Sequence, residues 1–299
     1  MLSSLALSIL ILPTLLVSGC ADDGEPPVPE RIVAIGDLHG DLEAARAALR
    51  LGGAIDAEDN WIGGDLVVVQ TGDILDRGDQ ERAIFALFRR LGEEASLAGG
   101  AVHVLNGNHE LMHAYHDFRY VTEGGYADYQ DVPVPQVLDS LLDSIDVHQR
   151  PRAMAFRPGG PSALLLAEQK TALILGSSLF THGVILPFHV DMGLDEMNRS
   201  IRSWLLDEIE QPEWIRGDNS PVWGRLYSRE PSQAACDTLD MVLDRLGVER
   251  MVVGHTVQET GITAYCGGRV WCIDVGMAAH YGGRSEVLEI RGDVVKSLR

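Results

Sequence analysis

The segment RIVAIGDLHG, residues 31–40, joins a short apolar run to a cluster of glycine, aspartate and histidine. An apolar run of this length that ends at a glycine is typical of a buried strand. Residues 41–51 follow it with an Ala/Leu-rich helical pattern. A strand followed directly by a helix begins a βαβ unit, so we expect an α/β domain.

The alternation of strands and helices continues along the chain. With 299 residues, 45% of them hydrophobic, the chain is long enough to bury the core of one large domain, which we place at residues 31–299. Its further elements are predicted as strands at 66–71, 101–105 and 251–253, helices at 79–92, 194–209 and 232–246, an apolar run at 172–181 and a hairpin through 287–290.

A polar cluster follows each of the first three predicted strands. The clusters are GDLHG at 36–40, GDILDRG at 72–78 and GNHE at 107–110, and two later apolar runs are followed by His182 and His255. In α/β sheets, ligands bind beyond the carboxyl ends of the strands. We therefore expect all five segments to converge on one site.

Two carboxylates, three imidazoles and one amide oxygen in these segments are suitable metal ligands: Asp37, His39, Asp73, Asn108, His182 and His255. One ion would take Asp37 and His39, the other the amide and the two later imidazoles, and Asp73 would bridge them. Such a pair of ions clamps a phosphate and lowers the pKa of a water between them, so that a metal-bridging hydroxide attacks phosphorus. The mixed oxygen and nitrogen ligands suit Mn, Fe or Zn better than Ca or Mg, and we expect Mn.

The remaining polar residues of the clusters match the other needs of phosphate hydrolysis. Arg77 offers a planar guanidinium that fits phosphate oxygens, and Arg225 is the candidate for a second one, with Asn108 as a further phosphate contact. His109 is expected to protonate the leaving oxygen, and Asp76 to orient its ring.

The three clusters match the patterns GDxHG, GDxxDRG and GNHE and resemble those of calcineurin-like metallophosphoesterases of the phosphoprotein phosphatase branch. Segments 117–121 (DFRYV), 182–205 and 273–277 (IDVGM) resemble the Shewanella-like protein phosphatases. The resemblance covers about residues 31–291. It implies an α/β fold with a two-sheet β sandwich flanked by helices and a dinuclear metal site at the carboxyl ends of the strands. Val184 departs from the family, which tends to have glycine there.

The resemblance implies a metal-dependent phosphomonoester hydrolase, in the first place a protein phosphatase acting on phosphotyrosine or on phosphoserine and phosphothreonine. Hydrolysis of dinucleotide polyphosphates or small phosphoesters is the alternative. The chain lacks the SAPNY-type segment of eukaryotic Ser/Thr phosphatases, so we do not carry their substrate preferences over.

Residues 113–165 are a candidate cap insertion. Four tyrosines at its start either contact the substrate or form a small separate core: Tyr115, Tyr120, Tyr126 and Tyr129.

Two other function classes fit part of the sequence. Residues 109–113, HELMH, match the HExxH pattern of zinc peptidases. Because Gly107 lies just upstream, we expect His109 at a strand-to-helix turn and not within a helix, and a peptidase would leave the other clusters unexplained. A non-catalytic binding lipoprotein is the second alternative, but a purely structural metal site has no need of His109 and its neighbours.

Charge and the N-terminus predict where the protein acts. The 44 acidic residues exceed the 24 basic residues, and the formal net charge of −20 argues against nucleic acid as a partner.

Residues 1–19 are uncharged and predict an export signal, and LVSGC at 16–20 resembles a bacterial lipobox with Cys20 as the lipidated residue. Residues 20–30 would then be an extended tether. We expect an exported, membrane-anchored lipoprotein that faces the periplasm or the cell exterior; an uncleaved anchor or an ordinary signal is the alternative.

Three further cysteines leave the disulfide pattern open. They are Cys236, Cys266 and Cys272, an odd number in a compartment that permits disulfides. Cys266 and Cys272 flank a predicted hairpin turn, so a bridge between these two and a pair of buried free thiols are both open.

Overall fold

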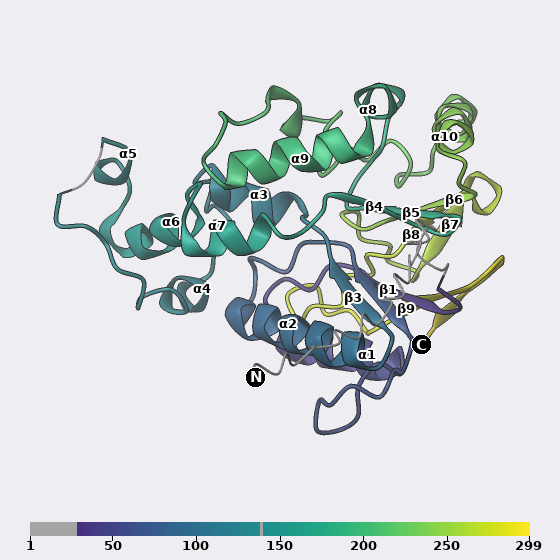
Figure 1. The fold of residues 1–299 in the computed structure, drawn as a ribbon, viewed down its shortest axis with the longest axis horizontal. Coiled ribbons are helices and arrows are strands. Elements are labelled where there is room, and N and C mark those ends of the chain that lie inside the picture. The colour runs from purple at the N-terminus through teal and green to yellow at the C-terminus, as the bar shows by residue number, and fades with distance from the viewer. Residues whose placement is uncertain (1–28, 138–139) are drawn as a thin grey trace, which may run out of the picture.

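Two five-stranded sheets form the centre of the computed structural model, which describes residues 29–137 and 140–299 (Figure 1). The first sheet has the order β10-β9-β1-β2-β3 and the second the order β4-β5-β6-β8-β7. The strands of the first sheet are β1 (Ile32–Ile35), β2 (Val67–Gln70), β3 (Ala101–Val104), β9 (Val287–Arg291) and β10 (Val294–Leu298). Those of the second are β4 (Ala172–Leu175), β5 (Ser178–Thr181), β6 (Arg250–Val253), β7 (Thr263–Tyr265) and β8 (Val270–Cys272).

The first strand is apolar throughout because both of its faces are covered. Ile32 and Ala34 face the core between the two sheets, whereas Val33 and Ile35 face the helices. Strands β1, β2 and β3 run parallel, as do β5, β6 and β8. Their carboxyl ends therefore gather at one edge of the sandwich. The predicted two-sheet sandwich is confirmed.

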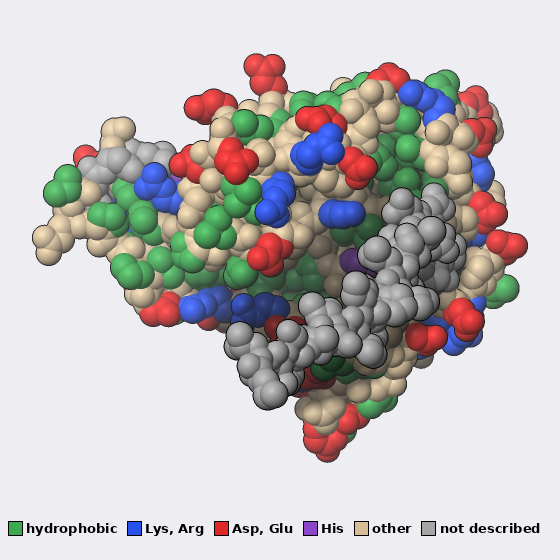
Figure 2. All heavy atoms as spheres, viewed as in Figure 1, with side chains coloured by type: hydrophobic (Ala, Val, Ile, Leu, Met, Phe, Trp, Pro, Cys, Tyr) green, Lys and Arg blue, Asp and Glu red, His purple; other side chains and the backbone are tan. Residues whose placement is uncertain are grey.

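Helices cover the outer faces of both sheets. Those before the third strand are α1 (Leu42–Leu51) and α2 (Glu81–Leu97), which cover the first sheet. The others are α3 (Asn108–Ala114), α4 (Glu123–Ala127), α5 (Ser140–Asp143), α6 (Arg150–Phe156), α7 (Pro161–Leu166), α8 (Pro187–Met192), α9 (Leu194–Leu205) and α10 (Gln233–Leu246), with short 3-10 turns at Val147–Gln149, Glu213–Ile215 and Cys266–Gly268. Acidic side chains are spread over the face shown in Figure 2.

Helix α2 is longer than the sequence predicts. The prediction stops at residue 92, where glycine weakens a helix by about 1 kcal/mol relative to alanine. In the structure the helix continues to Leu97, because Ala95 is fully buried and packing outweighs the weak propensity of Gly92. Helix α9 shows the reverse, since it ends at Leu205 and not at residue 209.

The segment from α4 to α7, which covers most of the candidate insertion at residues 113–165, extends to one side of the sandwich (Figure 1). Two of its tyrosines are core residues: Tyr129 packs into the largest apolar cluster, and Tyr126 belongs to a small separate core with Phe118. Tyr115 stacks on Trp204. Packing therefore accounts for these three tyrosines, and a substrate contact by this segment stays a prediction.

The N-terminal predictions fall outside the described part of the chain. The export signal at 1–19 and Cys20 lie within residues 1–28, of which the structure describes nothing. Within residues 29–137 and 140–299, no helix is both long and apolar enough to cross a membrane.

A disulfide joins Cys236 on α10 to Cys266, while Cys272 is a buried free thiol. A bridge across the hairpin between Cys266 and Cys272 is therefore excluded. Cys272 pairs with Thr263 in the strand register, so Cys266 lies beyond the paired residues and turns toward α10. Burial raises the pKa of the Cys272 thiol to about 12.

We expect this disulfide to stabilise the fold. A bridge that closes a loop of sequence separation 30 should contribute about 2–4 kcal/mol to the free energy of unfolding. Urea unfolding without reductant should show this loss in Cys236→Ser/Cys266→Ser. The wild type in reductant should fall to the level of the variant, while the variant itself should not respond. Equal stability of the oxidised wild type and the variant would contradict the prediction.

Candidate metal centre

All six predicted ligands meet at the edge of the sandwich where the parallel strands end. Each is buried, and each follows a strand: Asp37 and His39 after β1, Asp73 after β2, Asn108 after β3, His182 after β5 and His255 after β6. The structure thus brings together residues that are far apart in the sequence, as the strand-end rule predicts.

One group of ligand atoms surrounds His182. Its Nε2 lies 3.2 Å from Asp73 Oδ2, 3.0 Å from Asn108 Oδ1 and 3.2 Å from His255 Nδ1. Asp73, His182 and His255 offer three ligand atoms within 4.8 Å of one another. A compact set of nitrogen and oxygen donors is suited to one divalent transition metal.

A second group lies on the other side of Asp73. His39 Nε2 lies 3.9 Å from Asp73 Oδ2 and 4.0 Å from Asp37 Oδ2. His109 Nε2 approaches the same Asp73 oxygen to 3.7 Å, and His39, Asp73 and His109 also lie within ligand spacing. Because Asp73 belongs to both groups, its carboxylate is placed where a bridging ligand between two ions is needed.

The three imidazoles are oriented as metal ligands require. Each has one ring nitrogen against a backbone carbonyl: His39 Nδ1 at 3.0 Å from Leu75, His182 Nδ1 at 2.9 Å from Thr71 and His255 Nε2 at 3.1 Å from Trp223. Since a carbonyl only accepts, that nitrogen carries the proton and the other directs its lone pair into the cluster. Burial lowers the pKa of His39 to about 3 and that of His255 well below its ordinary value. The neutral rings fit a metal.

The carboxylates show that the site is built for cations. Burial raises the pKa of Asp73, but His182 and His109 outweigh it and hold this pKa well below its usual range. Burial and the neighbouring Asp274 raise the pKa of Asp37 well above its usual range, and burial with the Asp73 charge raises that of Asp274 to about 6. Two buried carboxylates facing each other need a compensating positive charge. Sequence reasoning assigned Asp274 no role, although it lies within the IDVGM segment.

Glu110 holds the loop that carries Asp73. Its carboxylate accepts hydrogen bonds from the amides of Asp73 at 2.8 Å and Gly107 at 2.7 Å. The same contacts leave it unable to act as the general base of a zinc peptidase. His109 does lie within helix α3, so the predicted position outside a helix is wrong; the amides that Glu110 binds, and not helix geometry, argue against that function.

His109 and Asp76 form a buried pair beside the two groups of ligands. His109 Nδ1 lies 2.5 Å from Asp76 Oδ2. Burial by itself lowers the pKa of His109, but Asp73 and Asp76 raise it above its ordinary value. Asp76 and Arg77 both have positive φ, at 70° and 65°, and form a tight turn. The Asp76 side chain meets His109, whereas the Arg77 side chain lies over the ring of Tyr120.

Two tyrosines flank the guanidinium of Arg77. It lies 4.5 Å from the ring centroid of Tyr120 and 5.3 Å from that of Tyr281, while Nη1 is 3.4 Å from His280 Nε2. The Tyr120 ring also lies 5.2 Å from that of His109. Tyr120 is thus the one tyrosine of the predicted four at the site. Tyr281 and His280 carry no local sequence signal and were not predicted.

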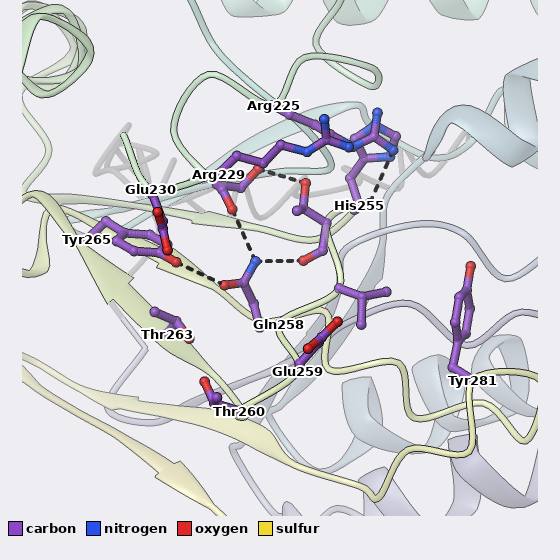
Figure 3. Close-up of a pocket in the computed structure, with 13 residues that line it drawn as sticks. Arg225, Arg229, Glu230, His255, Gln258, Glu259, Thr260, Thr263, Tyr265 and Tyr281 are labelled. Atoms are coloured by element: carbon purple, nitrogen blue, oxygen red, sulfur yellow. Dashed lines mark hydrogen bonds between the residues drawn. The ribbon is translucent and has the colours of Figure 1, made fainter. Parts of the chain in front are cut away.

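Arg225 approaches the cluster from the opposite side. Its Nη2 lies 3.5 Å from the carbonyl of His255, and burial together with Arg229 lowers its pKa. Figure 3 shows Arg225 and Arg229 side by side near His255, at one end of a cavity of about 540 Å³ that Tyr281 also lines. The wall of the cavity thus carries two arginines together with Glu230 and Glu259, and the cavity reaches the candidate ligand His255.

Known proteins resemble the chain over most of its length. Residues 30–259 match the calcineurin-like phosphoesterase family. Shewanella-like protein phosphatase 2 of Arabidopsis thaliana is 39% identical over 297 residues, which cover 89% of this chain and 76% of that protein. Shewanella-like protein phosphatase 1 of Plasmodium berghei is 27% identical over 281 residues, covering 90% and 74%.

Solved structures agree with this assignment. A cold-active protein tyrosine phosphatase of a psychrophilic Shewanella superposes with a TM-score of 0.70 at 25% identity, over 90% of this chain and 80% of that chain. A yeast protein serine/threonine phosphatase shares the fold, with a TM-score of 0.57 at 17% identity over 91% and 80%. The strand-end motifs, the sandwich and the extent of these matches lead to one conclusion: the chain belongs to the calcineurin-like phosphoesterases and, within them, to the Shewanella-like protein phosphatases.

Proposed function

We propose that this metal-dependent phosphoester hydrolase removes phosphate from phosphoproteins, with phosphotyrosine as a favoured substrate. The observation that carries the proposal is the convergence of two ligand groups on Asp73, with the His109–Asp76 pair and two arginines around them. The family is dinuclear and metal-dependent, and the candidate ligands present here fit it.

We assign the first ion to Asp37, His39 and Asp73, and the second to Asp73, Asn108, His182 and His255. Nitrogen and oxygen donors in this mixture favour Mn, with Fe or Zn as alternatives. Two divalent ions bound here would polarise the phosphate and lower the pKa of the attacking water.

The arginines bind and orient the phosphate. Arg77 has its guanidinium between the rings of Tyr120 and Tyr281, with Nη1 at 3.4 Å from His280 Nε2, and its other N–H groups can bind phosphate oxygens. Arg225 reaches the same region from the side of His255. Two guanidiniums that bind the non-ester oxygens of the phosphate would keep its orientation constant. The ester oxygen of the leaving group would then always face the same side of the site.

His109 is placed to protonate that ester oxygen. Asp76 binds its Nδ1, so Nε2 faces the cluster of ligands where the substrate phosphate must lie. The carboxylate raises the pKa of the ring and keeps a proton available for the leaving group.

The aromatic walls support a phosphotyrosine substrate. Tyr120 and Tyr281 provide flat surfaces next to the phosphate-binding Arg77, and aromatic pairs gain about 0.5–1.5 kcal/mol beyond their buried area. The structurally similar Shewanella enzyme is itself a protein tyrosine phosphatase. Dinucleotide polyphosphates remain the alternative substrate class, and competition between a phosphopeptide and a dinucleotide separates the two.

Asp73→Asn is expected to abolish most of the activity, because the amide removes the bridging charge from both ions. Turnover of an aryl phosphate with Mn should fall more than about 100-fold, and the bound metal measured by elemental analysis should fall with it. Asp65→Asn, the same change at an exposed position just before β2, should leave both values unchanged. Full metal content and activity in Asp73→Asn would refute the assignment.

His109→Ala should affect substrates according to their leaving group. A serine alkoxide needs a proton from the enzyme, whereas a phenolate leaves more easily, so kcat for a phosphoserine peptide should fall by about 10²–10⁴ and that for a phosphotyrosine peptide by less. His103→Ala, on β3 and outside the site, serves as the control. Equal losses on both peptides would contradict the acid role of His109.

We also propose that the enzyme is exported and held at a membrane through a lipid on Cys20, facing the periplasm or the cell exterior. The support is the uncharged segment 1–19 followed by LVSGC. Cells that express the wild type with radiolabelled palmitate should yield a labelled protein in the membrane fraction. Cys20→Ala should be unlabelled, and label retained in that variant would exclude lipidation at this residue.

A further inference from the structure

The insertion reaches beneath the catalytic pair through one fully buried arginine. Arg152, on α6, binds Glu81 with Nη2 2.9 Å from Oε1, and Nη1 lies 2.7 Å from Oε2 in an ion pair without hydrogen-bond alignment. Nη1 also donates to the Gly125 carbonyl at 2.8 Å, and the rings of Tyr129 and Phe156 lie 4.7 and 5.2 Å from the guanidinium. Replacing a buried ion pair by apolar residues is often neutral or stabilising, so stability alone gives no reason for this pair.

Arg152 also determines the protonation of His113. Its Nη2 lies 2.8 Å from His113 Nε2, and a guanidinium only donates, so Nε2 must accept. The proton of the ring is then on Nδ1, which donates to the carbonyl of His109 at 2.9 Å. Both contacts together require the neutral Nδ1–H tautomer.

This tautomer keeps His113 from competing for Asp76. Asp76 Oδ1 lies 3.3 Å from the same His113 Nε2, but no proton is available there to donate. Among the described residues, Asp76 Oδ1 has no hydrogen-bond partner, while Oδ2 meets His109 Nδ1 at 2.5 Å. The backbone amide of Asp76 donates to Glu81 Oε1 at 2.6 Å. Arg152 thus binds both Glu81, which holds the Asp76 amide, and His113, which lies beside the Asp76 carboxylate.

We propose that Arg152 is a positioning residue for leaving-group protonation: by occupying His113 Nε2 and anchoring Glu81, it commits the Asp76 carboxylate to His109. Without Arg152, His113 Nε2 can take up a second proton while Nδ1–H still donates to the His109 carbonyl. The Nε2 proton can then be donated to Asp76, which divides the carboxylate between two imidazoles. The inference rests on the acid role of His109 given above. It makes the insertion a support for the catalytic pair.

A paired variant separates this role from simple destabilisation. Arg152→Met alone leaves Glu81 buried without its partner, which is strongly destabilising. Arg152→Met/Glu81→Gln removes both charges, and the glutamine carbonyl can still accept from the Asp76 amide. Arg150→Met is the matched control, because Arg150 lies on the same helix but, among the residues that the structure describes, donates hydrogen bonds to the carbonyls of Ile145 and Asp143 alone.

The kinetic test compares phosphoserine and phosphotyrosine peptides with the Mn-loaded enzymes, after metal content and urea unfolding show that each variant is folded. In the paired variant we expect kcat for phosphoserine relative to phosphotyrosine to fall about tenfold, with KM unchanged. Arg150→Met should keep the wild-type ratio. In the His109→Ala background, the same pair of changes should alter the ratio less than about twofold, because the positioned group is gone.

Imidazole ¹⁵N NMR tests the structural step without activity. The wild type should show His113 in the Nδ1–H tautomer, and the paired variant should show a proton on Nε2. Suppose that His109→Ala lowers phosphoserine turnover more than phosphotyrosine turnover, but that the paired variant keeps the wild-type peptide ratio or keeps His113 Nε2 unprotonated. The inference about Arg152 is then wrong, while the acid role of His109 stands. Equal losses on both peptides in His109→Ala would instead overturn the acid role and, with it, the inference.

Discussion

The site depends on one buried carboxylate, that of Asp73, at the end of the central parallel strand of three. Its backbone amide is held by Glu110, and its side chain lies between the imidazoles of His39, His109 and His182. Burial by itself raises the pKa of such a carboxylate, but the neighbouring His182 and His109 hold the pKa of Asp73 well below its usual range. A shift of this loop would therefore disturb both groups of metal ligands together.

The sandwich places this carboxylate with little freedom. Strands β1, β2 and β3 are covered on both faces, so their register and their ends are determined by the packing of two cores. The loops that leave them begin with glycines that could not carry a side chain: a Cβ on Gly72 would lie 2.4 Å from the amide nitrogen of Gly107. The close approach of two strand ends brings Asp73 within reach of Asn108 and His109.

The charge of the protein and the charge of its site are opposed. A net charge of −20 repels a phosphorylated substrate at long range. Close to the site, Arg77, Arg225 and Arg229 present positive charge, and divalent ions held by the candidate ligands would add to it. On the other side, the buried Tyr126, Tyr129 and Arg152 of the segment from α4 to α7 form a packed support.

The sequence by itself determined the fold class and the six candidate ligands that the structure brings together. Apolar periodicity located the strands. Asp37, Asp73 and Asn108 each lie within four residues of a strand end, so topology alone brings them together. Helix ends were less certain, because Gly92 could be judged only by the packing of α2.

Only the tertiary structure decided the contacts between residues without a local motif. Cys266 could pair with Cys236 or Cys272 by sequence, and the direction of its side chain at the hairpin turn selects Cys236. Asp274 and Tyr281 reach the site from segments whose sequence shows no metal or phosphate pattern. The tautomers of the histidines depend on carbonyls and a guanidinium that packing brings into place. Local sequence patterns indicate the secondary structure of a single segment. These contacts depend instead on the distances between segments, which are set only when the sheets pack.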